Sequence, residues 1–346
     1  MARRKTRGGK RGGTGVAGFL LFLLLIAAAV AAGGAWLILT PYGPSNETFV
    51  TIAPGSSATS IARRLEAAGI VRTRYAFDAV RAWHRGTLQA GTYRFDHPMA
   101  VTEVYSHIAH GDVFTLTVTV PEGANIFDIA ARLEQAGLAR RQDFLVAAQK
   151  QTQLIADLDP SASSLEGYLF PDTYRLPPAI TAVQIATAMV KRFRQAASQL
   201  GLDQNVHRVV TIASLVERET AVDSERPLVA SVFENRLAKR MPLNTDPAVI
   251  YGLELGGHWR GAIYASDLTR DTAYNTYLHP GLPPGPVANP GMASLRAAMN
   301  PAHTSYLYFV AAGLDAQGHS LFSSTLDEHN RNVAEYRAAQ KKAGMR

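Results

Sequence analysis

The chain has 346 residues and no cysteine, which is enough for about two domains and excludes disulfides, thiolate nucleophiles and Cys-ligated zinc. Its 47% hydrophobic and 18% charged residues exclude disorder of the whole chain. The net charge is +7, but six cationic residues lie before residue 12 and leave the body at +1, so we expect no nucleic-acid partner.

Residues 16–39 carry no charge and are long enough to span a bilayer as a helix. The basic cluster at 3–11 precedes this stretch, so the positive-inside rule places residues 1–15 in the cytoplasm and the body outside. A cleaved signal peptide is the alternative, because small residues fill 27–35. We favour an uncleaved anchor in the cytoplasmic (inner) membrane, since the apolar character resumes at 36–39. Both interpretations export the body.

A short linker is expected at 40–48, followed by one pattern that occurs twice at an offset of 68 residues. An alternating β-branched run, a turn and an amphipathic helix end at Gly69 in the first copy and at Gly137 in the second. Between the copies, residues 91–95 predict a strand and 101–110 a helix. We therefore predict a small α/β domain at 49–115, with the second copy beginning a larger domain at 116–340.

The sequence pattern of the larger domain changes from about residue 165. Hydrophobic periodicity predicts helices at 181–200, 206–219 and 226–240. The stretch 281–291 is rich in Pro and Gly and predicts a stiff loop, which either lines a site or is a turn scaffold. Residues 335–346 predict a charged tail or a fraying helix. The fold class is therefore α+β.

Motifs for metal or nucleotide chemistry are absent. The chain contains no H-E-x-x-H, G-x-S-x-G, Walker A or dinucleotide fingerprint. No two histidines have the helical i, i+4 spacing of a metal site with a carboxylate helper, and His319 and His329 are interpreted as structural. We expect no metal and no cofactor, which leaves catalysis by carboxylates.

One carboxylate interrupts the apolar face of the helix expected near 209–219. Ile212, Leu215 and Val216 form the stripe, and Glu219 occupies its next position. Apolar surroundings raise the pKa of a carboxyl group, as a general acid requires. Glu217 points roughly 200° away and is predicted to be solvated. The alternative is that Glu219 ends the helix in solvent or pairs with an arginine, either Arg218 or Arg226.

A second group of carboxylates lies at 166–174. Here Glu166 and Asp172 alternate with aromatic residues that could stack on sugar rings. The alternative is a turn with a buried aromatic core.

Five ordered motifs then identify a resemblance. They are A-S-L-V-E-R-E-T at 213–220, V-A-S-V-F-E-N-R-L at 229–237, T-D-P-A-V-I-Y-G at 245–252, A-Y-N-T-Y at 273–277 and G-L-P-P-G at 281–285. Together they resemble the YceG-like (MltG) family of membrane-bound endolytic murein transglycosylases. The resemblance implies a small LysM-like domain and a catalytic domain with a catalytic helix. It also implies cleavage of nascent peptidoglycan strands between N-acetylmuramic acid and N-acetylglucosamine.

The resemblance places the catalytic acid on Glu219, in agreement with the helix phase, and implies 1,6-anhydro sugar ends as the product. One carboxylate can serve both proton transfers, so no second partner is required. Peptidoglycan strands, the cytoplasmic membrane and peptidoglycan synthases are the expected partners. The expected substrate-positioning residues are Glu166, Tyr168, Asp172, Asn235, Asp246, Tyr274 and Asn275. A non-catalytic glycan-binding scaffold and a water-using glycoside hydrolase remain the alternatives.

Overall fold

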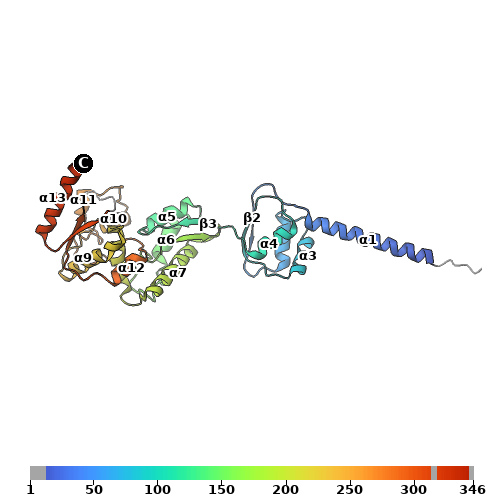
Figure 1. Cartoon of the computed structure of the whole chain (residues 1–346), viewed down its shortest axis with the longest axis horizontal. Helices are drawn as coiled ribbons and strands as arrows, with labels where there is room; N and C mark the ends of the chain where they lie inside the picture. The colour runs from blue at the N-terminus through green and yellow to red at the C-terminus, as the bar shows by residue number, and fades with distance from the viewer. Residues whose placement is uncertain (1–12, 313–317, 343–346) are drawn as a thin grey trace, which may run out of the picture. The chain divides into compact units, whose positions relative to one another are not determined.

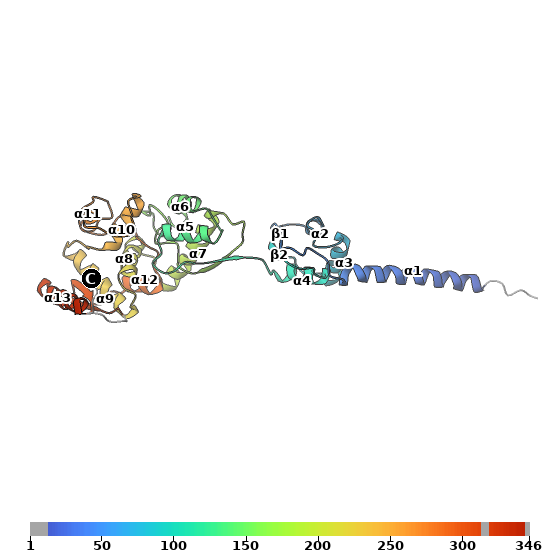
Figure 2. The ribbon, with the colours of Figure 1, turned by 90° about the horizontal axis from the view of Figure 1, so that it is seen from above.

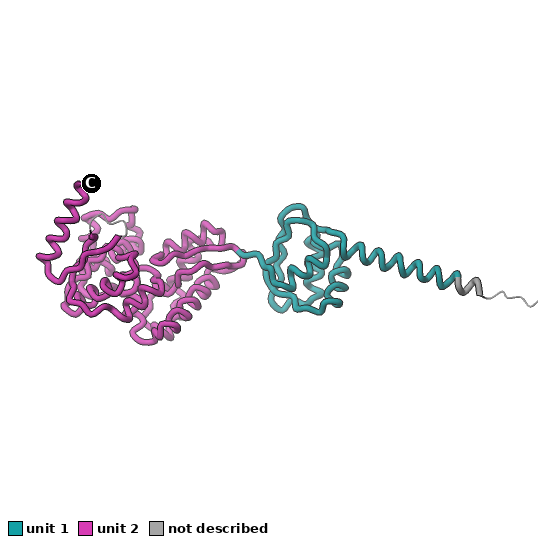
Figure 3. The backbone as a smooth tube through the Cα atoms, viewed as in Figure 1, with its two compact units in different colours: residues 1–115 teal, residues 116–346 magenta. Residues whose placement is uncertain are grey.

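The computed structural model describes residues 13–312 and 318–342, so the predicted basic N-terminal segment and the end of the predicted tail lie largely outside it. The chain divides into two compact units, Met1–Thr115 and Leu116–Arg346, coloured separately in Figure 3. The fold is α+β: helices predominate, and the strands in the described part of the chain form three antiparallel pairs.

The first unit begins with the apolar helix α1 (Gly13–Leu39). Its segment Gly18–Leu39 is uncharged and long enough to cross a membrane, a property that a signal sequence shares. At its C-terminal end, Leu37 and Ile38 pack against the core of the following small domain. The end of α1 is therefore part of the first unit's packing.

The small domain of the first unit is a strand–helix–helix–strand arrangement followed by one more helix. Strand β1 (Thr48–Ile52) pairs antiparallel with β2 (Gly91–Phe95), and the helices α2 (Ala58–Ala67) and α3 (Arg74–His84) lie between them in sequence. Helix α4 (Val101–His110) ends at Gly111, whose φ of 77° suits glycine. The strand predicted at 91–95 and the helix predicted at 101–110 are confirmed.

The same arrangement opens the second unit. Strand β3 (Leu116–Thr119) pairs antiparallel with β4 (Thr173–Leu176), and α5 (Ile126–Gln135) and α6 (Arg141–Lys150) intervene. The repeat extends to details: each first helix has a side-chain N-cap and a glycine at φ 69° after its end, and each strand pair contains a Thr–Thr contact of 3.0 Å. The predicted repeat is thus a repeated structure.

The rest of the second unit is mainly helical (Figure 1). After the short 3₁₀ turn at Thr152–Leu154, its elements are α7 (Ala182–Leu200), α8 (Val206–Glu219), a 3₁₀ turn (Asp223–Glu225), α9 (Arg226–Ala238), α10 (Asp246–Leu255), α11 (Ala265–Leu268), α12 (Met292–Met299), β5 (Tyr308–Ala311), β6 (Ser320–Ser323) and α13 (Leu326–Lys342). Strands β5 and β6 form the third antiparallel pair. The three predicted helices correspond to α7, α8 and α9.

Helix α8 lies at the centre of the second unit. All seven residues from Val210 to Val216 are buried, and α9, α10 and α12 pack around the helix (Figure 2). A helix buried on all sides has no solvated face, and only its ends can carry exposed polar groups. Its first turn, which holds His207 and Arg208, and its C-terminal turn, which holds Glu217 and Glu219, are therefore the parts of α8 available for polar chemistry.

Candidate active site

A cavity of about 530 Å³ opens at the C-terminal end of α8. Its walls come from α8, α9, the segment before α10, the start of α10, the turn at Tyr277, strand β5 and α13. The lining residues are Glu219, Phe233, Arg236, Leu243, Asn244, Thr245, Asp246, Tyr277, Tyr308, Phe309, Leu326, His329 and Asn330. Aromatic rings, two acids and an arginine thus surround one space, as expected of a site for a polar ligand with flat faces such as a sugar.

Glu219 is the final residue of α8 and is partly buried in this cavity. Burial, with a smaller contribution from the nearby charge of Asp246 and against opposing effects of Arg236 and Arg218, raises the pKa of its carboxyl group to about 7. The negative end of the helix dipole also disfavours an anion here. The carboxyl group can therefore give and accept a proton near neutral pH.

Asp246 faces Glu219 across the cavity from the first turn of α10. Its Oδ1 accepts a hydrogen bond of 2.7 Å from the hydroxyl of Tyr277. This bond fixes the orientation of the Asp246 carboxylate, so the charge that acts on Glu219 has a defined position. Asp246 is the one predicted positioning residue that lines the cavity together with Glu219.

Arg236 forms part of the cavity wall from α9. Its guanidinium donates to three backbone carbonyls, those of Leu307 at 2.7 Å, Leu243 at 2.9 Å and Pro242 at 3.3 Å. It also lies 5.2 Å from the ring centre of Tyr308. Arg236 therefore joins the segment before α10 to the strand that carries Tyr308, while its charge acts on Glu219.

His329 of α13 was interpreted as structural, but it lines the cavity. Its ring stacks on Tyr308 with centroids 5.1 Å apart. Burial lowers its pKa, and the positive charge of Arg236 lowers it further, so the ring is neutral near pH 7. Its Nδ1 is buried and has no hydrogen-bond partner among the described residues. His329 is thus a neutral polar group in the wall that faces Glu219.

The prediction that Glu217 is solvated is wrong. Its side chain is only 5% exposed and forms an ion pair of 2.8 Å with Arg226, which is 6% exposed. The other Glu217 oxygen accepts a hydrogen bond of 2.9 Å from the backbone nitrogen of Gly291, the N-cap of α12. Helix phase correctly separated Glu217 from Glu219, but α12 covers the face that was taken as open to water.

Glu166 is buried away from the cavity. One of its oxygens accepts a hydrogen bond of 2.9 Å from the backbone nitrogen of Ile126, and the other accepts one of 2.7 Å from the amide of Asn289. Burial raises its pKa to about 8. Asn289 also accepts from the Leu169 nitrogen and donates to the Ala124 carbonyl, so Glu166 and Asn289 together join three segments. We call these two residues and their backbone partners the Glu166 hub.

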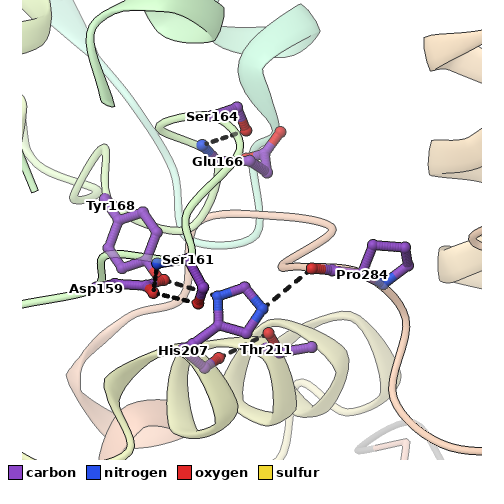
Figure 4. Close-up of polar contacts among 8 residues, drawn as sticks. All are labelled: Asp159, Ser161, Ser164, Glu166, Tyr168, His207, Thr211 and Pro284. Atoms are coloured by element: carbon purple, nitrogen blue, oxygen red, sulfur yellow. Dashed lines mark hydrogen bonds and ion pairs between the residues drawn. The ribbon is translucent and has the colours of Figure 1, made fainter. Parts of the chain in front are cut away.

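Tyr168 also lies outside the cavity, in the polar cluster of Figure 4. Its hydroxyl donates to the buried Asp159, which also contacts the Nδ1 of His207 at 2.7 Å and accepts from the backbone nitrogen and the hydroxyl of Ser161. The Nε2 of His207 lies 3.0 Å from the carbonyl oxygen of Pro284, in the Pro/Gly-rich loop. The cluster thus holds the stiff loop against the start of α8.

The four other predicted positioning residues have internal partners. Asp172 pairs with Arg192 at 2.7 Å, and Tyr274 packs on Tyr251 with centroids 5.0 Å apart. Two of them support the cavity wall indirectly. Asn235 donates to the carbonyls of residues 304 and 306, just before β5, and Asn275 accepts from the backbone nitrogen of Tyr277. They shape segments that present Tyr308 and Tyr277.

Several residues that line the cavity are not among the predicted site residues. Arg236 and Tyr277 belong to the quoted motifs at 229–237 and 273–277, so the motifs point to both residues. The motifs alone do not show which of their residues line the cavity and which support its walls. His329 has no comparable signal. Among the described residues, no group of three His, Asp or Glu side chains has the arrangement of a metal site.

The chain is similar in sequence to proteins of a known family. A sequence profile of the YceG-like family matches residues 50–335. An endolytic murein transglycosylase of Bacillus subtilis (strain 168) is 33% identical over 331 residues, which covers 88% of this chain and 90% of that protein. An endolytic murein transglycosylase of Streptococcus pneumoniae (serotype 2, strain D39) is 31% identical over 358 residues, and the match covers 93% of this chain but 65% of that protein.

A solved structure agrees with these matches. The crystal structure of a putative YceG-like protein of Listeria monocytogenes superimposes with a TM-score of 0.54 at 32% identity. The match covers 83% of this chain and 99% of that one. The family match spans both the small domain and every element that lines the cavity. The chain therefore belongs to the YceG-like family.

Proposed function

We propose that this protein is an endolytic peptidoglycan lytic transglycosylase with Glu219 as its catalytic acid and base. The observation that carries the proposal is a partly buried carboxyl group, with a pKa raised to about 7, in a cavity lined by aromatic and polar side chains. The names of the Bacillus and Streptococcus relatives support the reaction class. The bond cleaved is the one between N-acetylmuramic acid and N-acetylglucosamine within a glycan strand.

The reaction begins with protonated Glu219, which gives its proton to the glycosidic oxygen as the bond from that oxygen to C1 of the muramoyl sugar breaks. The muramoyl acetamido oxygen stabilises the positive charge that develops at C1. The C6 hydroxyl oxygen then bonds to C1, and its proton returns to Glu219. The product is a 1,6-anhydro-muramoyl end, and no water is consumed.

Asp246 and Arg236 adjust the acid without taking part in bond breaking. The Asp246 carboxylate favours the protonated form of Glu219 before the reaction, and the Arg236 guanidinium stabilises the anion after proton transfer. Burial together with these opposite charges holds the pKa of Glu219 near 7. A pKa near the working pH is the optimum for a group that must act as acid and then as base.

The location follows from α1. In this proposal α1 is an uncleaved anchor in the cytoplasmic membrane, with the N-terminus inside and both folded units outside. The small domain of the first unit acts as a LysM-like glycan-binding module, and peptidoglycan synthases supply the nascent strands. A mature form that starts after about residue 32 would contradict the anchor.

Mass spectrometry of glycan strands after digestion tests the activity. We expect anhydro-muramoyl ends with the natural protein, and none with E219Q. Reducing ends would instead identify a hydrolase that uses water, and intact strands would identify a non-catalytic glycan-binding scaffold. A matched control is E234Q on the neighbouring helix, since Glu234 does not line the cavity and its ion pair with Arg208 is partly exposed.

A further inference from the structure

Helix α3 of the first unit has an exposed face that its own domain does not use. Ala76, Phe77 and Val80 are buried in the small domain. By contrast, Tyr75 is 66% exposed and Trp83 is 86% exposed. They are eight residues apart, which separates the two rings by about 80° around an α-helix. A tryptophan exposed to this degree has no role in the packing of the domain.

The charge around this helix is strongly positive. Between residues 72 and 85 the chain has four arginines, namely Arg72, Arg74, Arg81 and Arg85, and a single acid, Asp78. Arg81 and Arg85 are exposed at the C-terminal end of α3, and Arg81 lies about 200° from Trp83 around the helix, on the opposite flank of the exposed face. The Arg74 guanidinium donates a hydrogen bond of 2.8 Å to the Tyr75 hydroxyl and lies 4.8 Å from the centre of the Tyr75 ring. Arginine next to tryptophan and tyrosine is the composition that proteins use at the interface between membrane and water.

The structure also gives α3 a position relative to the apolar helix α1. The Arg72 guanidinium, two residues before α3, lies 4.5 Å from the ring centre of Trp36 and 4.6 Å from that of Tyr42. Trp36 is in the last turn of the apolar stretch, which ends at Leu39. In both Figure 1 and Figure 2, α3 lies on the side of the small domain from which α1 leaves. The start of α3 therefore lies close to the C-terminal end of α1.

We propose that α3 docks the small domain onto the outer leaflet of the membrane, with Tyr75 and Trp83 among the lipid headgroups and Arg81 and Arg85 on their phosphates. This inference rests on the proposed role of α1 as an anchor. Packing of Leu37 and Ile38 against the core of the small domain leaves no flexible spacer between anchor and domain. The face of α3 is therefore held next to the bilayer surface rather than presented to bulk solvent.

The experiment uses the natural tryptophans of the full chain in vesicles that contain anionic lipids. Residues 36, 83 and 259 are the three tryptophans, so each pair of Trp-to-Phe substitutions leaves one reporter. In W36F/W259F, we expect the emission of Trp83 to lie at short wavelength and to fall when lipids brominated in the upper acyl chain replace ordinary lipids. In W36F/W83F, Trp259 of the second unit should show no bromolipid quenching.

The W83F/W259F variant separates failure of this inference from failure of the anchor. If Trp36 is quenched and Trp83 is not, α1 spans the bilayer but α3 does not touch it, and the inference is overturned. If neither is quenched, the anchor itself fails. A response of Trp83 to added glycan fragments, with no response to bromolipids, would assign the face to glycan binding instead.

A charge variant tests the arginines separately. We expect R81Q/R85Q, made in the background that retains Trp83 alone, to lose quenching, and the loss to resemble that caused by high salt on the parent. Both side chains are exposed, so folding should be unaffected. The matched control R140Q/R141Q lies in the second unit and should leave the quenching of Trp83 unchanged. Equal quenching in all variants would exclude a contribution of Arg81 and Arg85 to docking.

Discussion

The cavity around Glu219 and the Glu166 hub both raise the pKa of a carboxyl group, to about 7 and about 8. Burial is the first cause in both places. The two carboxyl groups differ in their access to a ligand. Glu219 lines a cavity of about 530 Å³, whereas both oxygens of Glu166 accept hydrogen bonds from internal donors. A raised pKa therefore identifies a buried acid, and access to a cavity decides whether that acid can meet a substrate.

The largest effect should come from the acid in the cavity. We expect E219Q to lower the turnover of glycan strands by about 10²–10⁴-fold, because the amide keeps the shape but has no proton to give. The melting temperature should not fall, because burying a neutral amide at this position costs no more free energy than burying the carboxyl group. Turnover and thermal unfolding of one preparation check both parts. A strong loss of activity in E166Q, with E219Q still active, would mean that Glu166 and not Glu219 is the acid that acts on the substrate.

The next largest effect concerns Glu217, two residues from Glu219. Loss of one partner of a buried ion pair costs about 3–5 kcal/mol, and we expect E217Q to lie at the low end because the amide can still accept from Gly291. Denaturant unfolding measures this loss. E217Q should lose stability first and activity in proportion to the unfolded fraction. A stable but inactive E217Q would contradict the division of roles between the two glutamates.

The Glu166 hub makes stability depend on pH. Because the pKa of Glu166 is about 8 in the folded chain and 4.5 ordinarily, the folded state holds more protons between these values. The contribution of this group to stability is therefore fully present below pH 4.5 and is lost as pH rises toward 8, by up to a few kcal/mol. Unfolding free energies of the natural protein and of E166Q, measured from pH 5 to 8, should differ in slope. Parallel curves of unfolding free energy against pH would mean that Glu166 is not the group that takes up this proton.

The smallest effect tests the charge that faces Glu219. D246N removes a negative charge that raises the pKa of Glu219, so the general acid should ionise at lower pH. The alkaline limb of the profile of kcat against pH should move toward acid, while the pH dependence of stability that comes from Glu166 stays the same. The matched variant Y277F, which removes only the hydroxyl that orients Asp246, should move the limb less. An unchanged profile in D246N would mean that Asp246 does not act on Glu219.

Much of this fold could be predicted from local patterns, and the site only in part. The repeat, the helices at 206–219 and 226–240, and the position of Glu219 on its helix follow from periodicity, which reports local structure. The environment of Glu217 depends on α12, about 75 residues later in the chain, and no local pattern contains it. For the same reason no local pattern shows that Asn289 is a partner of Glu166 and Asp159 a partner of Tyr168, two of the predicted positioning residues.

The origin of the cavity walls has a consequence for the order of events as the chain is made. The small domain closes when β2 pairs with β1, so it is complete by about residue 110. The cavity takes Glu219 from α8 and its far wall from α13, which begins at Leu326. Domains fold in order from the N-terminus during synthesis. Chain growth thus yields a folded small domain long before it yields an active enzyme, and a chain that stops before α13 lacks one wall of its active site.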